Sequence, residues 1–161
     1  MEFDDRDRKI LALLQSDCRI SNADLADRVG MSASACWRRV RAFEEAGIIE
    51  RYGAVLNPER LGLEFEAIVL IQLTRHDPDK LSELVRVIGQ RPEVLSCYAT
   101  TGQSDYHMHV LFPDIATYNS FLETVLFRMP AVASAQTNVV LRKIKRTEVI
   151  SPATPHDRAL G

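Results

Sequence analysis

The sequence lacks the signatures of several protein classes. Its three cysteines, Cys18, Cys36 and Cys97, are widely spaced and form no Cys-x-x-Cys pair, so neither a disulfide framework nor a zinc site is expected. No apolar run approaches the ~18 residues that a membrane-spanning helix needs. Residues 1–5 carry three acidic side chains, where a secretory signal would be basic and then apolar. The sequence therefore predicts a cytoplasmic protein with no membrane segment.

The sequence also lacks recognisable catalytic motifs. It has no glycine-rich phosphate loop, no nucleophile elbow, no His-Glu-x-x-His pattern and no arrangement that suggests a Ser-His-Asp triad. We therefore expect neither an enzyme nor a bound cofactor or metal. What the chain does have is 161 residues, 46% of them hydrophobic and 26% charged, which is typical of one ordinary folded domain or two small ones.

The first third of the chain predicts three helices. Residues 5–16 carry an apolar stripe at helical spacing, and Ser21 can cap a short second helix that ends at Gly30. Ser32 can cap a third helix that ends at Gly47. Two helices joined by a tight turn that contains glycine predict a helix-turn-helix motif.

The second half alternates strands and helices in the order βαββαβ. We expect strands at residues 65–73, 94–101, 106–112 and 132–143 and helices at 79–89 and 115–129. This order predicts a ferredoxin-like antiparallel sheet with both helices on one face. Residues 67–71 are apolar at both odd and even positions, so both faces of the sheet should be apolar. The two helices can cover only one of them, so the other face is expected to meet another subunit.

These elements predict an α+β chain with two domains. We expect a winged helix-turn-helix domain at 1–57 that includes a two-stranded wing at 48–56, followed by a linker at 58–64. The ferredoxin-like domain then spans 65–148, and residues 149–161 are expected to form a flexible tail.

The third helix carries a local excess of positive charge in a chain whose formal net charge is −2. Residues 28–43 hold four arginines and no acidic residue. With its apolar side chains turned inward, this helix points polar and basic side chains outward. Because arginine can bind phosphate or the edge of guanine with two hydrogen bonds, we predict a DNA-contacting face. Its expected residues are Ser32, Ser34, Trp37, Arg38, Arg39 and Arg41.

Two alternatives stand beside this prediction. A run of arginines on a helix can be a solvated face with no ligand. Trp37 could stack at the DNA backbone, but a lone tryptophan more often packs against a neighbouring helix, and packing is the preferred interpretation.

Several stretches resemble the Lrp/AsnC family of bacterial and archaeal transcription regulators. They are DRKIL at 7–11, DCRISN at 17–22, LA at 25–26, VGMS at 29–32, RRV at 38–40, LNP at 56–58 and GQSDY at 102–106. The resemblance covers about residues 4–148. It implies a regulator that binds double-stranded DNA and an amino-acid effector, and that forms a homodimer assembling further to a tetramer or octamer.

The resemblance places the effector near the Gly-x-x-Asp-Tyr turn at 102–106, where backbone amides and a carboxylate could hold a zwitterion. The implied ligand-binding residues are Gly102, Ser104, Asp105 and Tyr106, with Tyr98, Thr100 and Thr137 as weaker neighbours. From the residues alone, the favoured interpretation is that Gly102 and Asp105 only shape the hairpin.

Other interpretations remain at this point. His107 and His109 could form a metal site with Cys97 or Asp105, but they supply only two ligands, and sheet histidines at a subunit interface explain them adequately. Ferredoxin-like domains also occur as amino-acid-binding regulatory subunits and small enzymes. A winged helix used only for protein contacts is a third possibility.

Overall fold

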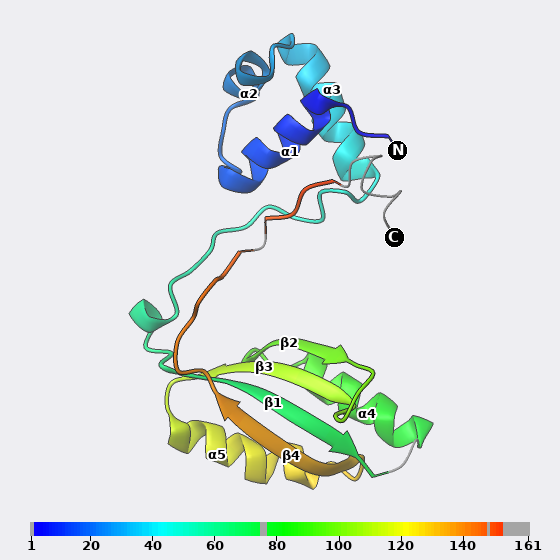
Figure 1. Cartoon of the computed structure of the whole chain (residues 1–161), viewed down its shortest axis with the longest axis vertical. Helices are drawn as coiled ribbons and strands as arrows, with labels where there is room; N and C mark the ends of the chain where they lie inside the picture. Colours follow the sequence, from blue (N-terminus) through cyan, green and yellow to red (C-terminus); the bar gives the residue numbers. More distant parts are fainter. Residues whose placement is uncertain (1, 75–76, 148, 153–161) are drawn as a thin grey trace. The chain divides into compact units, whose positions relative to one another are not determined.

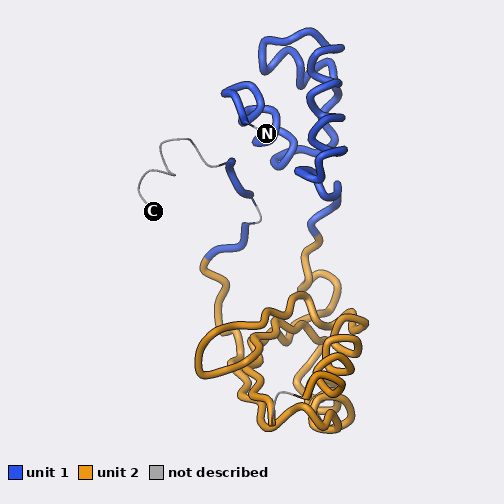
Figure 2. Tube along the Cα trace, turned by 90° about the vertical axis from the view of Figure 1, so that its right-hand side faces the viewer, with its two compact units in different colours: residues 1–55, 145–161 blue, residues 56–144 orange. Residues whose placement is uncertain are grey.

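The protein divides into two compact units, which we describe separately. The computed structural model describes residues 2–74, 77–147 and 149–152. One unit comprises residues 1–55 together with 145–161, and the other comprises residues 56–144 (Figure 2). No helix within the described residues is long and apolar enough to cross a membrane.

The first unit contains the three predicted helices. They are α1 (Asp5–Ser16), α2 (Asn22–Val29) and α3 (Ala33–Glu45) (Figure 1). A side chain just before each helix caps its first turn. Asp4 forms a capping box with Asp7 at the start of α1. The Ser21 and Ser32 side chains each accept a hydrogen bond from the backbone amide of the third residue of α2 and of α3, respectively. Gly30 ends α2 with a left-handed φ of 65°, a conformation that glycine adopts without strain.

The core of the first unit lies where the three helices meet. The buried apolar side chains are Ile10, Leu11, Leu25, Ala26, Val29, Cys36 and Phe43. Cys36 is fully buried, and this burial raises the pKa of its thiol. The cysteine is therefore a packing residue in this unit.

The predicted two-stranded wing at 48–56 is absent, since no strand forms there in the part of the chain that the structure describes. The amides of Ile48 and Ile49 both donate to the carbonyl of Phe43, so these residues finish α3, and they pack on the core of the first unit. The segment after them has no neighbouring strand to pair with. An isolated two-stranded hairpin is only marginally stable, which explains the difference.

The second unit is the predicted ferredoxin-like domain. Its strands are β1 (Phe65–Leu73), β2 (Val94–Ala99), β3 (Tyr106–Phe112) and β4 (Val132–Val139), and its helices are α4 (Pro78–Gly89) and α5 (Ile115–Thr124). Short 3-10 helices η1 (Glu59–Leu61) and η2 (Leu126–Arg128) precede β1 and follow α5. The strands form one antiparallel sheet in the order β2-β3-β1-β4. The predicted order βαββαβ is confirmed.

The two faces of this sheet differ. Helices α4 and α5 cover one face of the sheet (Figure 1). On β1, Val69 and Ile71 belong to the core on this face and are almost fully buried. Ile68 and Leu70 alternate with them, and these two side chains are only half-buried. The helices therefore cover one face, and the sheet keeps a second face with apolar side chains.

The C-terminal segment differs from the predicted flexible tail at 149–161. The Ile150 amide donates to Oε1 of Gln15 at 2.8 Å, and Nε2 of Gln15 donates to the Ile150 carbonyl at 2.8 Å. Arg8 of the same helix donates to the Pro152 carbonyl at 2.9 Å. Residues 149–152 therefore dock on α1, and the rest of the predicted tail lies outside the described residues.

We expect Gln15→Ala to release this docked segment. The variant loses both bonds to Ile150, so the Ile150 amide should exchange with solvent much faster, and the free energy of unfolding of the first unit should fall by about 1 kcal/mol. Hydrogen exchange measures both effects. Gln15→Glu should give an intermediate exchange rate, because its Oε1 still accepts from the Ile150 amide but its carboxylate cannot donate to the Ile150 carbonyl. Equal exchange rates in the wild type and Gln15→Ala would contradict the docking.

Candidate DNA-reading face and ligand loop

The turn between α2 and α3 fixes the two helices relative to each other. The Met31 amide donates back to the Ala26 carbonyl, and Ser32 immediately starts the next helix. The Asn22 side chain, at the first position of α2, donates to the Ala33 carbonyl at 2.9 Å. The starts of both helices are thus tied together, which is the geometry a helix-turn-helix needs to present its second helix.

The outer face of α3 carries the residues expected to contact DNA. Cys36 and Phe43 point into the core. Ser34, Trp37 and Arg38 are exposed, and Ser32 lies at the N-terminal end of the same helix with its Oγ 3.4 Å from that of Ser34. The structure therefore brings most of the predicted contact residues to one surface.

Arg39 is placed differently from the prediction. Its Nη1 lies 2.8 Å from both carboxylate oxygens of Asp7, and its Nη2 lies 3.2 Å from Asp4. Asp7 is only 1% exposed, so this carboxylate is buried, and beside the Asp4 amide of the capping box the guanidinium is its charged partner. Arg39 joins α3 to α1, and we no longer assign it to the DNA-contacting face.

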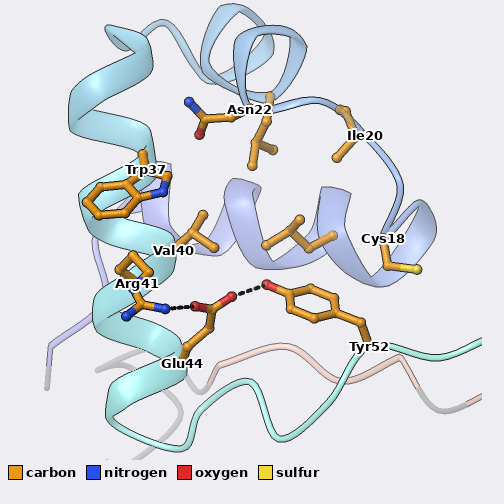
Figure 3. Close-up of a pocket in the computed structure, with 10 residues that line it drawn as sticks. Cys18, Ile20, Asn22, Trp37, Val40, Arg41, Glu44 and Tyr52 are labelled. Carbon is orange, nitrogen blue, oxygen red and sulfur yellow. Dashed lines mark hydrogen bonds and ion pairs between the residues drawn. The ribbon is translucent and has the colours of Figure 1, made fainter.

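Arg41 is exposed but paired. It lies 3.4 Å from Glu44 (Figure 3) and 3.6 Å from Glu45. Its guanidinium lies 5.9 Å from the centre of the Trp37 ring. Tyr52 donates to Glu44 at 2.9 Å; burial, and then the hydrogen bond to Glu44, raise the pKa of Tyr52 to about 12. Two carboxylates therefore offset much of the positive charge of Arg41.

Arg38 has no such partner. It forms no hydrogen bond or ion pair with any other residue that the structure describes, and it is exposed. A guanidinium held on a helix surface without a carboxylate keeps all five N–H donors for an external acceptor. Of the three arginines on α3, Arg38 is thus the one best placed for phosphate or a base edge.

Trp37 is exposed by 55%, so the preferred interpretation, packing against a neighbouring helix, is wrong. One side of its ring borders a groove of about 420 Å³ beneath α3, beside Val40 (Figure 3). Arg41 lies over the ring. The indole is therefore held at the surface by a cation–π contact rather than enclosed by the core.

The predicted ligand loop is fixed by hydrogen bonds at both ends. Oδ2 of Asp105 accepts from the Leu73 amide at 2.8 Å, and the Asp105 amide donates to the Ile71 carbonyl at 2.9 Å. Thr100 closes the other side, since its Oγ1 donates to the Ser104 carbonyl at 2.9 Å. Gly102 and Ser104 lie inside this closed loop, and Tyr106 begins β3 directly after it. Hydrogen bonds thus hold the loop at the end of β1.

The two remaining candidates lie on opposite faces of the sheet. Tyr98 pairs with His107 on the face that the helices leave uncovered and is 63% exposed. Thr137 is hydrogen-bonded to Tyr118 of α5, on the helix-covered face. Because Thr137 pairs with Val69 rather than with the end of β1, the structure does not bring it to the loop, and we withdraw it as a ligand contact.

The histidine pair lies on the uncovered face of the sheet. His109 Nε2 is 2.7 Å from Glu66 Oε1, and Lys143 Nζ is 2.6 Å from Glu66 Oε2. Burial acts to raise the Glu66 pKa, but the hydrogen bonds from Lys143 and His109 outweigh it, and the pKa is lowered. The neighbouring ammonium disfavours a cation here, and no group of three metal-ligating side chains occurs among the residues described.

Sequence reasoning missed three residues that shape these sites. Asp7 anchors Arg39, Asn22 ties the two helices, and Gln72 donates to the Gln103 carbonyl of the loop at 3.0 Å. The Asp-x-x-Asp pattern at Asp4 and Asp7 signals a helix start, but it does not reveal that the second carboxylate is buried against α3.

Comparison with known proteins supports a regulatory role. Residues 66–150 match the family model described as the Lrp/AsnC ligand binding domain, and residues 3–50 match a winged helix-turn-helix DNA-binding model. The leucine-responsive regulatory protein of Escherichia coli (strain K12) is 36% identical over 146 residues, which cover 91% of this chain and 89% of that protein. The transcriptional regulator AzlB of Bacillus subtilis is 34% identical over 145 residues, 90% of this chain and 92% of that protein.

A solved structure is similar over nearly the whole chain. It is a transcriptional regulator from Neisseria meningitidis in complex with L-Met, with 35% sequence identity and a TM-score of 0.89. The match covers 96% of this chain and 99% of that one.

Proposed function

Since the chain belongs to the Lrp/AsnC family of DNA-binding transcriptional regulators, we propose that α3 reads operator DNA and that the second unit binds an amino-acid effector and joins subunits. The family consists of regulators rather than enzymes, so the small-enzyme alternative is dropped. The protein acts in the cytoplasm, where the DNA that it regulates is accessible.

One observation carries the DNA-reading assignment. Arg38 is an exposed guanidinium on the outer face of the second helix of a helix-turn-helix, without a carboxylate partner among the described residues. In a dimer, two such helices would enter successive major grooves. The operator should therefore be roughly two-fold symmetric, with half-sites about one helical turn apart.

Selection of fragments from sheared genomic DNA by the purified full chain tests this function. At physiological salt, we expect the recovered fragments to share one symmetric motif, because non-specific phosphate binding weakens steeply with salt. Recovery of fragments in the same proportions as the input would contradict sequence-specific reading. The remaining interpretation would then be a winged helix used only for protein contacts.

The loop at 102–106 supports an amino-acid effector. Its backbone amides suit a carboxylate, and Oδ1 of Asp105 remains for an ammonium because Leu73 uses only Oδ2. A relative of known structure binds L-Met. We assign Gly102, Ser104, Asp105 and Tyr106 to this site, with Tyr98 and Thr100 as neighbours.

We expect Asp105→Asn to weaken effector binding at least about tenfold, because a hydrogen bond to a charged group contributes roughly 1.5–3 kcal/mol. The amide oxygen of Asn can still accept from the Leu73 amide, so the loop should persist. Titration calorimetry with each of the twenty amino acids first identifies the ligand in the wild type, and then compares the variant. Asp79→Asn on α4 is the charge-matched control, and equal affinity in Asp105→Asn and the wild type would refute the assignment.

The uncovered sheet face supports the proposed dimer. Its β1 side chains include Ile68 and Leu70, apolar groups that the two helices of the same chain do not reach. Packing this face against the same face of a second chain would bury them, as a two-fold interface does. Dimers would then assemble to a tetramer or octamer.

Leu70→Lys should convert the dimer to a monomer, since two ammonium groups would be buried near each other at a two-fold contact. Light scattering after gel filtration gives the mass directly. Val85→Lys, which replaces an exposed apolar side chain on α4, should keep the mass of the wild type. An unchanged mass for Leu70→Lys would show that subunits meet elsewhere.

A further inference from the structure

An open hollow lies on the outer surface where α2 and α3 begin. It has a volume of about 550 Å³ and is lined by Asn22, Ala33, Ser34, Trp37 and Arg38. It combines one large apolar ring with polar and charged groups. A surface of this kind on the DNA-facing side of a helix can distinguish bases as well as bind phosphate.

Trp37 supplies the apolar wall. The 55% exposed indole leaves much apolar area in water, which is costly for the isolated protein. The ring is nevertheless restrained, because Arg41 lies 5.9 Å from its centre and is itself held by Glu44 and Glu45. A restrained and exposed ring is ready to pack against an apolar group of a ligand.

Arg38 and Asn22 supply hydrogen-bonding groups that the protein itself leaves unused. Arg38 has no partner among the described residues. Asn22 donates its Nδ2 to the Ala33 carbonyl, which fixes the side chain and leaves Oδ1 as an acceptor beside the hollow. The charge here is positive and unbalanced, as a DNA ligand requires.

We propose that Trp37 and Arg38 read two adjacent base pairs, the indole packing on the 5-methyl group of a thymine and the guanidinium bonding O6 and N7 of a guanine. This inference rests on the proposed DNA-reading function and names the bases read by that site. Thymine is the base that presents an apolar group in the major groove, and guanine is the base whose edge matches arginine. The bases are adjacent because both side chains line the same hollow.

Base analogues in the selected genomic fragment test the proposal. Deoxyuridine lacks only the methyl group of thymine, and 7-deazaguanine lacks only the N7 acceptor of guanine. At one symmetry-related thymine, deoxyuridine should weaken wild-type binding about fourfold when it replaces the thymine of one half-site and roughly fifteenfold when it replaces both, the amount expected for one buried methyl group each. Trp37→Ala should bind the thymine and deoxyuridine duplexes equally. At the neighbouring guanine, 7-deazaguanine should weaken the wild type but not Arg38→Ala.

The controls separate this proposal from the function on which it rests. Trp37→Phe should keep part of the methyl sensitivity, and thermal unfolding of Trp37→Ala should differ from the wild type only by the small loss of the contact with Arg41, because the ring lies outside the core. A wild type insensitive to deoxyuridine at every thymine would overturn the proposal, and so would a Trp37→Ala variant that keeps the sensitivity. Because a shared motif must first be recovered to make these duplexes, such a result would leave DNA reading itself intact, whereas recovery of no motif would overturn both.

Discussion

Arg38→Ala should strongly weaken specific operator binding while leaving the fold and the oligomer unchanged. A bidentate contact to a base contributes about 1–3 kcal/mol, so losing it in both half-sites of a dimer should weaken binding at least roughly 30-fold. The physical reason is that Arg38 is exposed and has no partner among the described residues, so its removal breaks no contact within the chain. Fluorescence anisotropy with the selected fragment, at one fixed salt concentration, measures the change.

Two variants control for lost charge. Arg86→Ala removes an exposed arginine from α4 in the second unit and should bind the fragment like the wild type. Arg41→Ala should cost less than Arg38→Ala, because Glu44 and Glu45 already offset the Arg41 charge. Replacing Arg38 and Arg41 together should leave no specific binding. Retention of wild-type affinity by the double variant would contradict the assignment of α3 as the DNA-contacting helix.

Arg39→Ala should destabilise the first unit by about 3 kcal/mol. The substitution leaves the Asp7 carboxylate, which is 1% exposed, without the guanidinium 2.8 Å away. A buried charge that loses its partner typically costs about 3–5 kcal/mol, and the half-exposed Arg39 side chain places this pair at the low end. Urea unfolding followed by tryptophan fluorescence reports on this unit, because Trp37 is the one tryptophan in the sequence.

Arg38→Ala is the matched control for this experiment, since it removes the neighbouring arginine from the same helix. We expect it to change the free energy of unfolding by less than about 0.5 kcal/mol, as substitutions at exposed sites without special contacts usually do. Arg38→Ala should thus lower the DNA affinity, whereas Arg39→Ala should lower the free energy of unfolding. If Arg39→Ala unfolds at the same urea concentration as Arg38→Ala, the ion pair with Asp7 contributes nothing to stability.

Much of the fold could be predicted because the signals were local. Ser21, Gly30 and Ser32 mark the helix ends through bonds to residues within four positions along the chain. The apolar run at residues 67–71 likewise predicted that both faces of the sheet need cover. Such features depend on neighbouring residues, so a single sequence carries them.

The features that were missed depend on residues far apart in the sequence. Arg38 and Arg39 look alike in the sequence, and they differ because Asp7, 32 positions before Arg39, is buried beneath one of them. Gln15 and Ile150 are 135 positions apart, so no local sequence pattern predicts that the C-terminal segment docks on α1. Long-range pairing of this kind sets which side chains remain available to a ligand.

The candidate ligand loop also combines local features that the sequence predicts with long-range contacts that it does not predict. The glycine and aspartate of the turn were visible in the sequence, whereas the bond from the Leu73 amide to Asp105 links the loop to the end of a strand 32 positions earlier. Thr137 was misplaced because the register of β4 pairs it with Val69 in the interior of β1, whereas the loop bonds to Ile71 and Leu73.

Sequence-specific DNA reading by α3 is tested most directly by comparing the affinity of the full chain for its selected fragment with its affinity for a scrambled duplex of the same length and composition, at physiological salt. We expect a preference of at least about a thousandfold, because base contacts add to phosphate contacts that both duplexes share. Equal affinity for the two duplexes would contradict sequence-specific reading, since it would mean that α3 binds only phosphate.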